Sequence, residues 1–156
     1  MEGNDLDNYK IRELVNVLKI NRTLTSLNLD NNSLDRTGLR ELGNVLKVNE
    51  SITTLNIESN EFGDLGLEGL SEALKLNKTL TALYIGQNRM DVEGLRMLGE
   101  ALKINKSLAT IGLNFAEINH EGLKQLAEAL IINETLSDLN IKNNLIASEG
   151  AEVLAG

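Results

Sequence analysis

The stretch NRTLTSLNLDNNSL, residues 21–34, contains the pattern LxxLxLxxN, in which Leu24, Leu27 and Leu29 precede Asn32. Four variants of it follow at intervals of 28 residues without insertion or deletion: NESITTLNIESNEF at 49–62, NKTLTALYIGQNRM at 77–90, NKSLATIGLNFAEI at 105–118 and NETLSDLNIKNNLI at 133–146. A unit of this length is too small to bury its own apolar face and must stack on its neighbours. The spacing therefore predicts a solenoid.

Each copy of the repeat reads as a short strand followed by a helix. Ser26 to Leu29 alternates polar and apolar residues, which predicts a strand with Leu27 and Leu29 pointing inward. The helix begins near Gly38, and its apolar face recurs in the three following repeats. That face consists of Leu39, Leu42, Val45 and Leu46 in the first full repeat. Because the turns are short and each strand is followed by a helix, neighbouring strands should be parallel.

We expect one domain over residues 1–156. Residues 1–20 form a helical half-repeat, with Ile11, Leu14, Val17 and Leu18 on one face, which covers the open edge of the first strand. The full repeats and the truncated fifth repeat are 21–48, 49–76, 77–104, 105–132 and 133–156. The fifth repeat starts a helix at Gly150 and shows no polar capping unit. This is typical of a fragment or a docking edge, and it predicts weak self-association there.

Composition limits the possible functions. The chain has no cysteine, so it carries no disulfide and no thiolate metal site, which favours a reducing, cytoplasmic location. No run approaches the roughly 18 apolar residues of a membrane span, and no signal peptide is recognisable. The net charge of −8 argues against nucleic acid or an anionic membrane as the main partner.

The sequence offers little chemistry. His120 is the one histidine and falls in the turn between Ile118 and Gly122, where we interpret it as a solvated residue. No phosphate-binding glycine motif is present, so we expect no enzyme activity, catalytic residue, cofactor or metal. On the helix surfaces we expect two ion pairs, Arg96 with Glu100 and Glu72 with Lys75.

Asparagines recur at two places in the repeat. One row should form a structural ladder in which side-chain amides bond the backbone of the turns: Asn32, Asn60, Asn88 and Asn144. Ala116 interrupts this row in the fourth repeat, so that turn must be satisfied differently or be looser. The other row starts N-x-S/T sequons at the helix-to-strand turns. We interpret these asparagines as helix-ending residues in the left-handed conformation rather than as glycosylation sites.

The chain resembles the ribonuclease-inhibitor-like subfamily of leucine-rich repeat proteins. The resemblance rests on five periods of LxxLxLxxN and on the GLxxLxxxL helix from Gly38 to Leu46. It implies an α/β right-handed leucine-rich repeat solenoid, a horseshoe segment with a parallel sheet on the concave face and helices on the convex face. Members include ribonuclease inhibitors, the sensor domains of NOD-like receptors, Ran GTPase-activating proteins and the actin-capping domain of tropomodulin. The run at 46–60 is similar to tropomodulin repeats.

The outward strand positions are not constrained by core packing, so they can be adapted to a partner. Tyr84 lies beside Gly86 and Gly112, an arrangement typical of an aromatic anchor in a shallow pocket. For Phe115 two interpretations stay open: it joins this anchor, or it turns into the core and compensates for Ala116. The candidate protein-binding residues are Asn28, Asp30, Asn56, Glu58, Tyr84, Gln87, Asn114, Phe115 and Lys142.

These residues favour a non-catalytic protein–protein interaction module that binds a protein partner on its concave face. Asp30 and Glu58 predict that the partner presents a basic element. The resemblance leaves two alternatives: a regulator of a partner's activity, of the GTPase-activating or actin-capping type, or a fragment of a larger sensor or bacterial effector.

Overall fold

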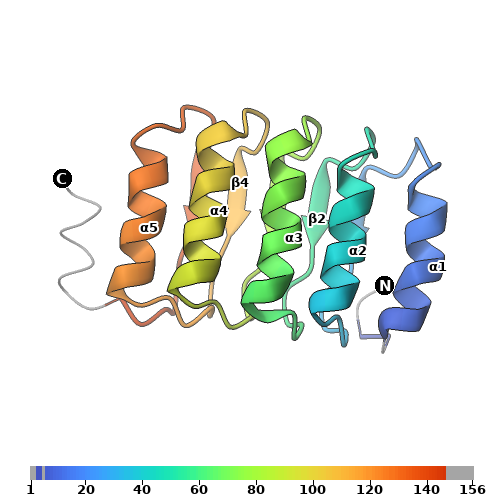
Figure 1. Cartoon of the computed structure of the whole chain (residues 1–156), viewed down its shortest axis with the longest axis horizontal. Helices are drawn as coiled ribbons and strands as arrows, with labels where there is room; N and C mark the ends of the chain where they lie inside the picture. Colours follow the sequence, from blue (N-terminus) through green and yellow to red (C-terminus); the bar gives the residue numbers. More distant parts are fainter. Residues whose placement is uncertain (1–2, 5, 147–156) are drawn as a thin grey trace.

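Helix and strand alternate along the whole of the computed structural model, which describes residues 3–4 and 6–146 (Figure 1). The helices are α1 (Asn8–Leu18), α2 (Arg36–Leu46), α3 (Gly63–Leu76), α4 (Val92–Ile104) and α5 (His120–Leu130). The strands are β1 (Ser26–Asn28), β2 (Thr54–Asn56), β3 (Ala82–Tyr84), β4 (Thr110–Gly112) and β5 (Asp138–Asn140). The helix predicted from Gly150 lies outside the described residues.

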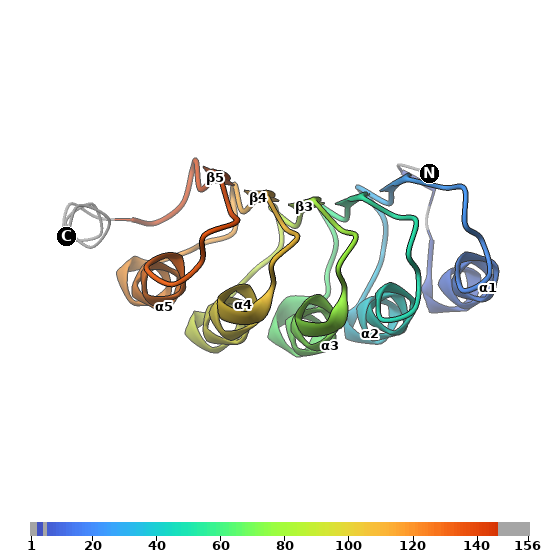
Figure 2. The ribbon, with the colours of Figure 1, turned by 90° about the horizontal axis from the view of Figure 1, so that it is seen from above.

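The five strands form one parallel sheet in the order β1-β2-β3-β4-β5. The register is that of the repeat: Leu27 pairs with Leu55, Leu55 with Leu83, Leu83 with Ile111, and Ile111 with Leu139. Seen from above, the strands lie along the inside of an arc and the helices along the outside (Figure 2). A helix is about 10 Å wide, whereas strands are spaced by about 4.8 Å, so stacking bends the array toward the sheet. The predicted α/β leucine-rich repeat solenoid is confirmed.

The core lies between the sheet and the helices. In the first full repeat the core contains the strand-side residues Leu27, Leu29 and Leu34 and the helix residues Leu39 and Leu42. The residues equivalent to Leu39 and Leu42 are also buried in the next three repeats. Each unit therefore contributes aliphatic side chains to one continuous core, as its apolar period predicts.

The first helix differs from its prediction at one position. Val17 was expected on the apolar face, but it is 57% exposed, and Val15 is buried in its place. Ile11, Val15 and Leu18 are spaced four and three residues apart, which aligns them on one side of a helix, and Leu14 packs partly beside them. Val17 lies two residues from Val15, about 200° around the helix axis, and so faces away from the core.

Short polar side chains cap the starts of α1, α2, α4 and α5, whereas α3 follows Phe62 and has no side-chain cap. The Asp35 carboxylate accepts hydrogen bonds from the backbone N–H groups of Thr37 and Gly38, at 2.7 and 3.2 Å. Asp7, Asp91 and Asn119 cap α1, α4 and α5 in the same way. Such caps satisfy N–H groups that have no partner inside the helix.

The predicted asparagine ladder is present at the strand-to-helix turns. The Asn60 amide donates to the carbonyls of Ile57 and Glu58 in its own turn and to Leu29, 31 residues earlier. Its oxygen accepts from the backbone of Leu34 in the preceding turn. Asn32, Asn88 and Asn144 make equivalent bonds. One side chain thus satisfies backbone groups in two neighbouring repeats.

Ala116 changes the fourth turn. The Met90 N–H donates to the Ala116 backbone carbonyl at 3.3 Å instead of to a side-chain oxygen. Glu117 adopts a left-handed conformation with φ 57°, which its counterparts in the other repeats do not. The hydrogen bond to the preceding turn is therefore made by a backbone carbonyl instead of an asparagine side chain. Of the two outcomes expected from the sequence, this is the turn that is satisfied differently.

The sequon asparagines form a second row at the helix-to-strand turns. The amide of buried Asn49 donates to the carbonyls of Leu18 and Asn21, and its oxygen accepts from the N–H groups of Ser51 and Ile52. Asn77, Asn105 and Asn133 repeat this pattern. Their expected left-handed conformation is wrong: Asn77 and Asn105 are extended, with ψ near 134° and 133°. The side-chain bonds, rather than an unusual φ, end these helices.

We predict that Asn88→Ala destabilises the fold by about 3 kcal/mol, because it leaves the carbonyls of Ile57 and Gly86 and the N–H of Asn60 without this partner in the interior. Urea unfolding monitored by circular dichroism measures the loss. Asn16→Ala, an exposed change on α1, serves as control and should shift stability by less than about 0.5 kcal/mol. Equal effects of the two substitutions would contradict the ladder's role.

Candidate protein-binding face

The candidate residues occupy matching positions on the concave side of the sheet. The pairing places Asn28 beside Asn56, Asn56 beside Tyr84, and Tyr84 beside Gly112. The asparagines of this row orient the residue two positions later. Asn28 Oδ1 accepts from the Asp30 N–H at 2.9 Å, and Asn56 Oδ1 accepts from the Glu58 N–H at 3.0 Å. Asn28 and Asn56 therefore fix the backbone conformation at Asp30 and Glu58.

Asp30 and Glu58 form an acidic pair on neighbouring repeats. Asp30 Oδ1 is buried and has no hydrogen-bond partner within the described part of the chain. Partial burial raises the pKa of the Glu58 carboxyl above its ordinary value, and the negative charge of Asp30 raises it further. A side-chain hydrogen bond from Asn114 opposes both effects on this pKa. Neither acid belongs to any of the four ion pairs among the described residues.

Gly86 allows Glu58 and Asn114 to meet although they belong to the second and fourth repeats. A Cβ atom at Gly86 would lie 2.8 Å from Asn114 Oδ1 and closer still to the Asn114 carbonyl. Any side chain there would displace the Asn114 amide from Glu58. The glycine therefore leaves space that Asn114 fills.

The raised pKa of Glu58 predicts a measurable titration. The folded state holds this proton more tightly than the unfolded state does. Protonated Glu58 therefore contributes to stability at pH values below 4.5, the ordinary pKa of the carboxyl, and this contribution is lost as the pH rises through the folded pKa. We expect carboxyl carbon NMR to give a pKa above 4.5 for Glu58, and Asp30→Asn to lower it. Exposed Glu13→Gln is the control, and a Glu58 pKa below 4.5 would contradict the described geometry.

Tyr84 is half-buried, and its ring lies over Gly112. A Cβ atom at Gly112 would approach Tyr84 Cδ1 to 2.8 Å, so the glycine permits this position. Tyr84 also borders a hollow of about 430 Å³, which is lined among others by Thr110, Asp138 and Lys142. The predicted aromatic anchor thus adjoins a shallow hollow, which lies toward β5 rather than over the glycines.

Phe115 does not enter the core, because its side chain is 54% exposed. It has a left-handed backbone with φ 54°, as do its counterparts Asn31, Ser59, Gln87 and Asn143. The repeat imposes this conformation, and for a bulky residue such as phenylalanine it is strained. Gln87 is held differently: its side-chain oxygen accepts from the Ser59 hydroxyl at 2.9 Å. An exposed aromatic kept in a strained position is a candidate contact residue.

We predict that Phe115→Asn stabilises the protein by about 1 kcal/mol, because asparagine tolerates the left-handed conformation better than phenylalanine does. The urea midpoint measures this change. Phe115→Leu keeps the strain, removes the ring and should bring no such gain. A less stable Phe115→Asn variant would show that the ring contributes to packing.

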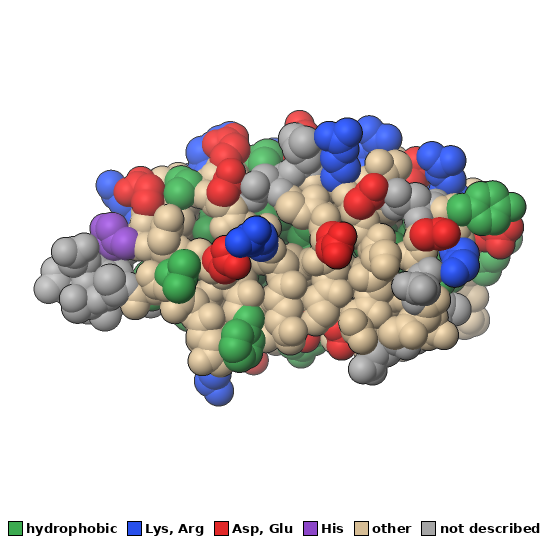
Figure 3. All heavy atoms as spheres, turned by 90° about the horizontal axis from the view of Figure 1, so that it is seen from below, with side chains coloured by type: hydrophobic (Ala, Val, Ile, Leu, Met, Phe, Trp, Pro, Cys, Tyr) green, Lys and Arg blue, Asp and Glu red, His purple; other side chains and the backbone are tan. Residues whose placement is uncertain are grey.

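The charges at the strand-to-helix edge are mixed in sign (Figure 3). Arg89 there bonds Glu117 of the next repeat, with 3.2 Å from Nε to Oε1, and both side chains are exposed. Lys142 is exposed beside the hollow. Asp138 was not selected from the sequence, although its register with Thr110 gives it a place on the same face.

Two surface interpretations need correction. His120 is not a solvated turn residue: it begins α5, is half-buried, and its buried Nδ1 has no hydrogen-bond partner among the described residues. Arg96 bonds Glu93 at 2.7 Å rather than Glu100, which pairs with Lys103 instead. In both pairs the partners lie three residues apart. The Glu72–Lys75 pair is confirmed.

Across the described residues, no group of three or more histidine, cysteine, aspartate or glutamate side chains could hold a metal ion. Within the same part of the chain, no helix is long and apolar enough to cross a membrane.

The comparisons with known proteins concern the repeat and the fold. The family model described as "Leucine Rich repeat" matches residues 21–43, 48–71, 76–99 and 133–155, which together are more than half of the chain. The chain belongs to the leucine-rich repeat family. The matched segments leave out the copy that carries Ala116. No curated protein matches this leucine-rich repeat chain.

Solved structures share the fold. The structure titled "Leiomodin-1 Actin-Binding Site 2 (ABS2)" is 19% identical, with a TM-score of 0.77, and the match covers 96% of this chain and 89% of that one. The tropomodulin C-terminal domain of Caenorhabditis elegans is 16% identical, with a TM-score of 0.76, over 93% and 89% of the two chains. At these identities the likeness shows a common fold.

Proposed function

We propose that this leucine-rich repeat protein is a non-catalytic interaction module that binds a protein partner on its concave face. The partner places a lysine or arginine against Asp30 and Glu58 and an apolar group against Tyr84 and Phe115. The observation that carries the proposal is the acidic pair: Asp30 Oδ1 is buried without a hydrogen-bond partner among the described residues, and the pKa of Glu58 is raised.

The acidic pair favours a basic partner group for electrostatic reasons. A buried carboxylate oxygen without a donor costs free energy, and an incoming ammonium or guanidinium supplies a charge-assisted hydrogen bond. The same contact favours the ionised form of Glu58. Affinity for the partner should therefore fall as pH drops through the raised pKa of this carboxyl.

The aromatic residues supply the apolar part of the contact. Tyr84 borders the hollow toward β5, and Phe115 is exposed one repeat along. Aromatic side chains next to a recess are frequent sources of binding energy in protein interfaces. The hydrogen bonds of both asparagine rows hold this face in place before contact, so little conformational entropy is lost on association.

Actin is the first partner to test, because one protein of similar fold is titled an actin-binding site. A regulator of actin assembly is the second candidate function, and slowed growth at the pointed end of filaments would distinguish it from simple binding. Stimulated GTP hydrolysis would indicate the GTPase-activating alternative instead. The cytoplasmic location stays a prediction.

We predict that the triple variant Asp30→Asn, Glu58→Lys, Tyr84→Ala loses the partner. The experiment is affinity isolation from cell extract with wild type and variant side by side, with purified actin as a separate sample. Proteins bound by wild type but at least about tenfold depleted with the variant are the partners, which corresponds to about 1.4 kcal/mol or more of binding free energy.

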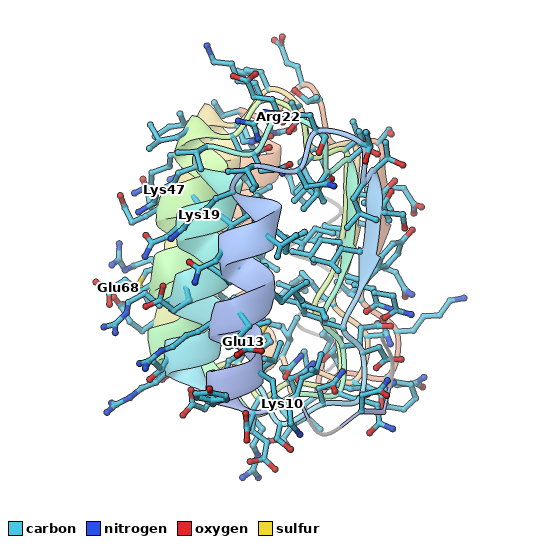
Figure 4. The ribbon with its side chains drawn as sticks, turned by 90° about the vertical axis from the view of Figure 1, so that its right-hand side faces the viewer. Lys10, Glu13, Lys19, Arg22, Lys47 and Glu68 are labelled. Atoms are coloured by element: carbon cyan, nitrogen blue, oxygen red, sulfur yellow. The ribbon has the colours of Figure 1, made fainter. Side chains whose placement is uncertain are left out.

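The matched control reverses one charge on the convex surface, with Glu68→Lys on α3, which is exposed (Figure 4). This control should bind as wild type does. Circular dichroism checks that every variant is folded. A folded triple variant that keeps every wild-type partner would exclude the concave face as the binding site.

A further inference from the structure

A row of exposed aliphatic side chains runs along the edge where the helices end and the chain turns toward the strands. The members stand 28 residues apart, each directly before a sequon asparagine or its equivalent: Ile20, Val48, Leu76, Ile104 and Ile132. Between 52% and 79% of each is exposed. Their strict period shows that all five lie at one register of the array, and we name them the aliphatic row.

The backbone under the aliphatic row is firmly held. The amide of Asn77 donates to the Leu46 carbonyl at 2.7 Å, and that of Asn105 donates to Leu74 at 2.7 Å, so each turn is bonded to the preceding repeat. Burial in the core does not explain the row, because the core uses Leu46, Leu74 and Leu102 instead. Five exposed aliphatic side chains aligned along one edge are more apolar surface than packing requires, which is typical of a contact site.

Basic residues accompany the row. Lys19, Lys47, Lys75 and Lys103 each precede a row member directly, and Arg22, Lys78 and Lys106 follow two residues after one. These seven are nearly half of the 15 lysines and arginines of a chain with net charge −8, so positive charge is concentrated on this edge. Figure 4 shows Lys19, Arg22 and Lys47 toward the end at which the helices finish, and Lys10 toward the other end.

Several of these cations lack a balancing acid. Lys75 and Lys103 pair with Glu72 and Glu100, one turn earlier on their helices. Lys19, Lys78 and Lys106 belong to none of the ion pairs found in the described ranges 3–4 and 6–146. The opposite edge differs, because acidic and basic side chains are interspersed there (Figure 3).

Two hollows lie between successive members of the row. One, of about 520 Å³, has the exposed Leu76 in its wall, with Lys47, Lys78 and the acidic Glu50 beside it. The next, of about 230 Å³, has Ile104 in its wall with Lys75, Lys78 and Lys106 around it. Each hollow thus combines an exposed aliphatic side chain with at least two lysines, of which Lys78 borders both.

We propose that this edge is a second docking surface, which takes an acidic amphipathic segment of a partner protein. Apolar side chains of the segment enter the hollows between row members, and its aspartates or glutamates face the unpaired lysines. The five row members are separated by four intervals, each between the strand spacing of about 5 Å and the helix width of about 10 Å. The row therefore spans about 20–40 Å, the length of a helix of about 13–27 residues. This surface lies at an edge of the array, apart from the concave face proposed above.

A protein segment fits this edge better than an anionic membrane does. The row contains no aromatic residue of the kind that anchors proteins in headgroup regions. The exposed side chains of the row also border hollows beside polar Asn77 and Asn105, and such hollows suit a matching side chain more than a flat bilayer.

The test uses a fluorescein-labelled helical peptide of about 20 residues, with leucine on one face and glutamate on the others. A basic counterpart with lysine in place of glutamate is run beside it. Fluorescence anisotropy with the whole chain should show binding of the acidic peptide only, weakening with added salt. Leu76→Ser with Ile104→Ser should weaken it about tenfold or more, as should Lys78→Glu with Lys106→Glu.

The control is Val17→Ser with Leu145→Ser, two exposed aliphatic residues outside the row, which should leave binding unchanged. The lysine pair has no ion-pair partners to lose, so it tests the proposal even if the serine pair unfolds. Equal binding of both peptides, no binding of the acidic one, or unchanged binding by the lysine pair would each overturn the proposal. So would a chain that sediments with phosphatidylserine vesicles through the row but ignores the acidic peptide. Loss of the concave-face partner in these variants is not expected, so the two surfaces are tested separately.

Discussion

Asparagine side chains join each turn of this solenoid to the one before it. On one edge the Asn60 amide reaches the Leu29 carbonyl, and on the other the Asn49 amide reaches the Leu18 carbonyl, each 31 residues back. Aliphatic burial supplies most of the driving force for stacking, but it has no direction. The side-chain amides fix the register of stacking, because each forms its hydrogen bonds only when the backbone of the neighbouring repeat lies at one distance and one alignment. The strands then align residue for residue, and every surface position recurs in a predictable place.

This rigidity determines what the concave face can do. Three-residue strands alone would make a weak sheet, yet the turns at both ends of each strand are hydrogen-bonded to the next repeat. Side chains on the inner wall therefore stand on a backbone that does not need ordering on contact. Strain and unsatisfied groups can persist there: Phe115 keeps a left-handed backbone, and Asp30 keeps a buried oxygen to which no described residue donates. Such features persist only where the surrounding structure determines them.

Departures from the repeat gather in the third and fourth copies. Gly86 and Gly112 replace larger side chains, and the space they leave is used by Asn114 and Tyr84. Ala116 removes one ladder amide, and the turn follows a second left-handed residue at Glu117. These departures lie around the proposed concave contact. The helix-to-strand edge shows the reverse, since its aliphatic residues recur in all five copies and its exposed surface is regular. The concave face of this scaffold therefore differs from repeat to repeat, whereas the surface of the helix-to-strand edge is periodic.

The 28-residue period was enough to predict the strands, the parallel order, the aliphatic core and the asparagine ladder, because each depends on a pattern within one repeat. Contacts between repeats were not readable in the same way. No local signal links Glu58 to Asn114 across Gly86, exposes Phe115 or buries Nδ1 of His120. Val17 differs, because the helical spacing of Ile11, Val15 and Leu18 already directs it away from the core. The sequon asparagines, expected in a left-handed conformation, are extended because their amides bond the preceding turn. The sequence determined which residues recur, and only the tertiary structure decided which recurring residues meet, because that depends on how far each side chain reaches across the stack.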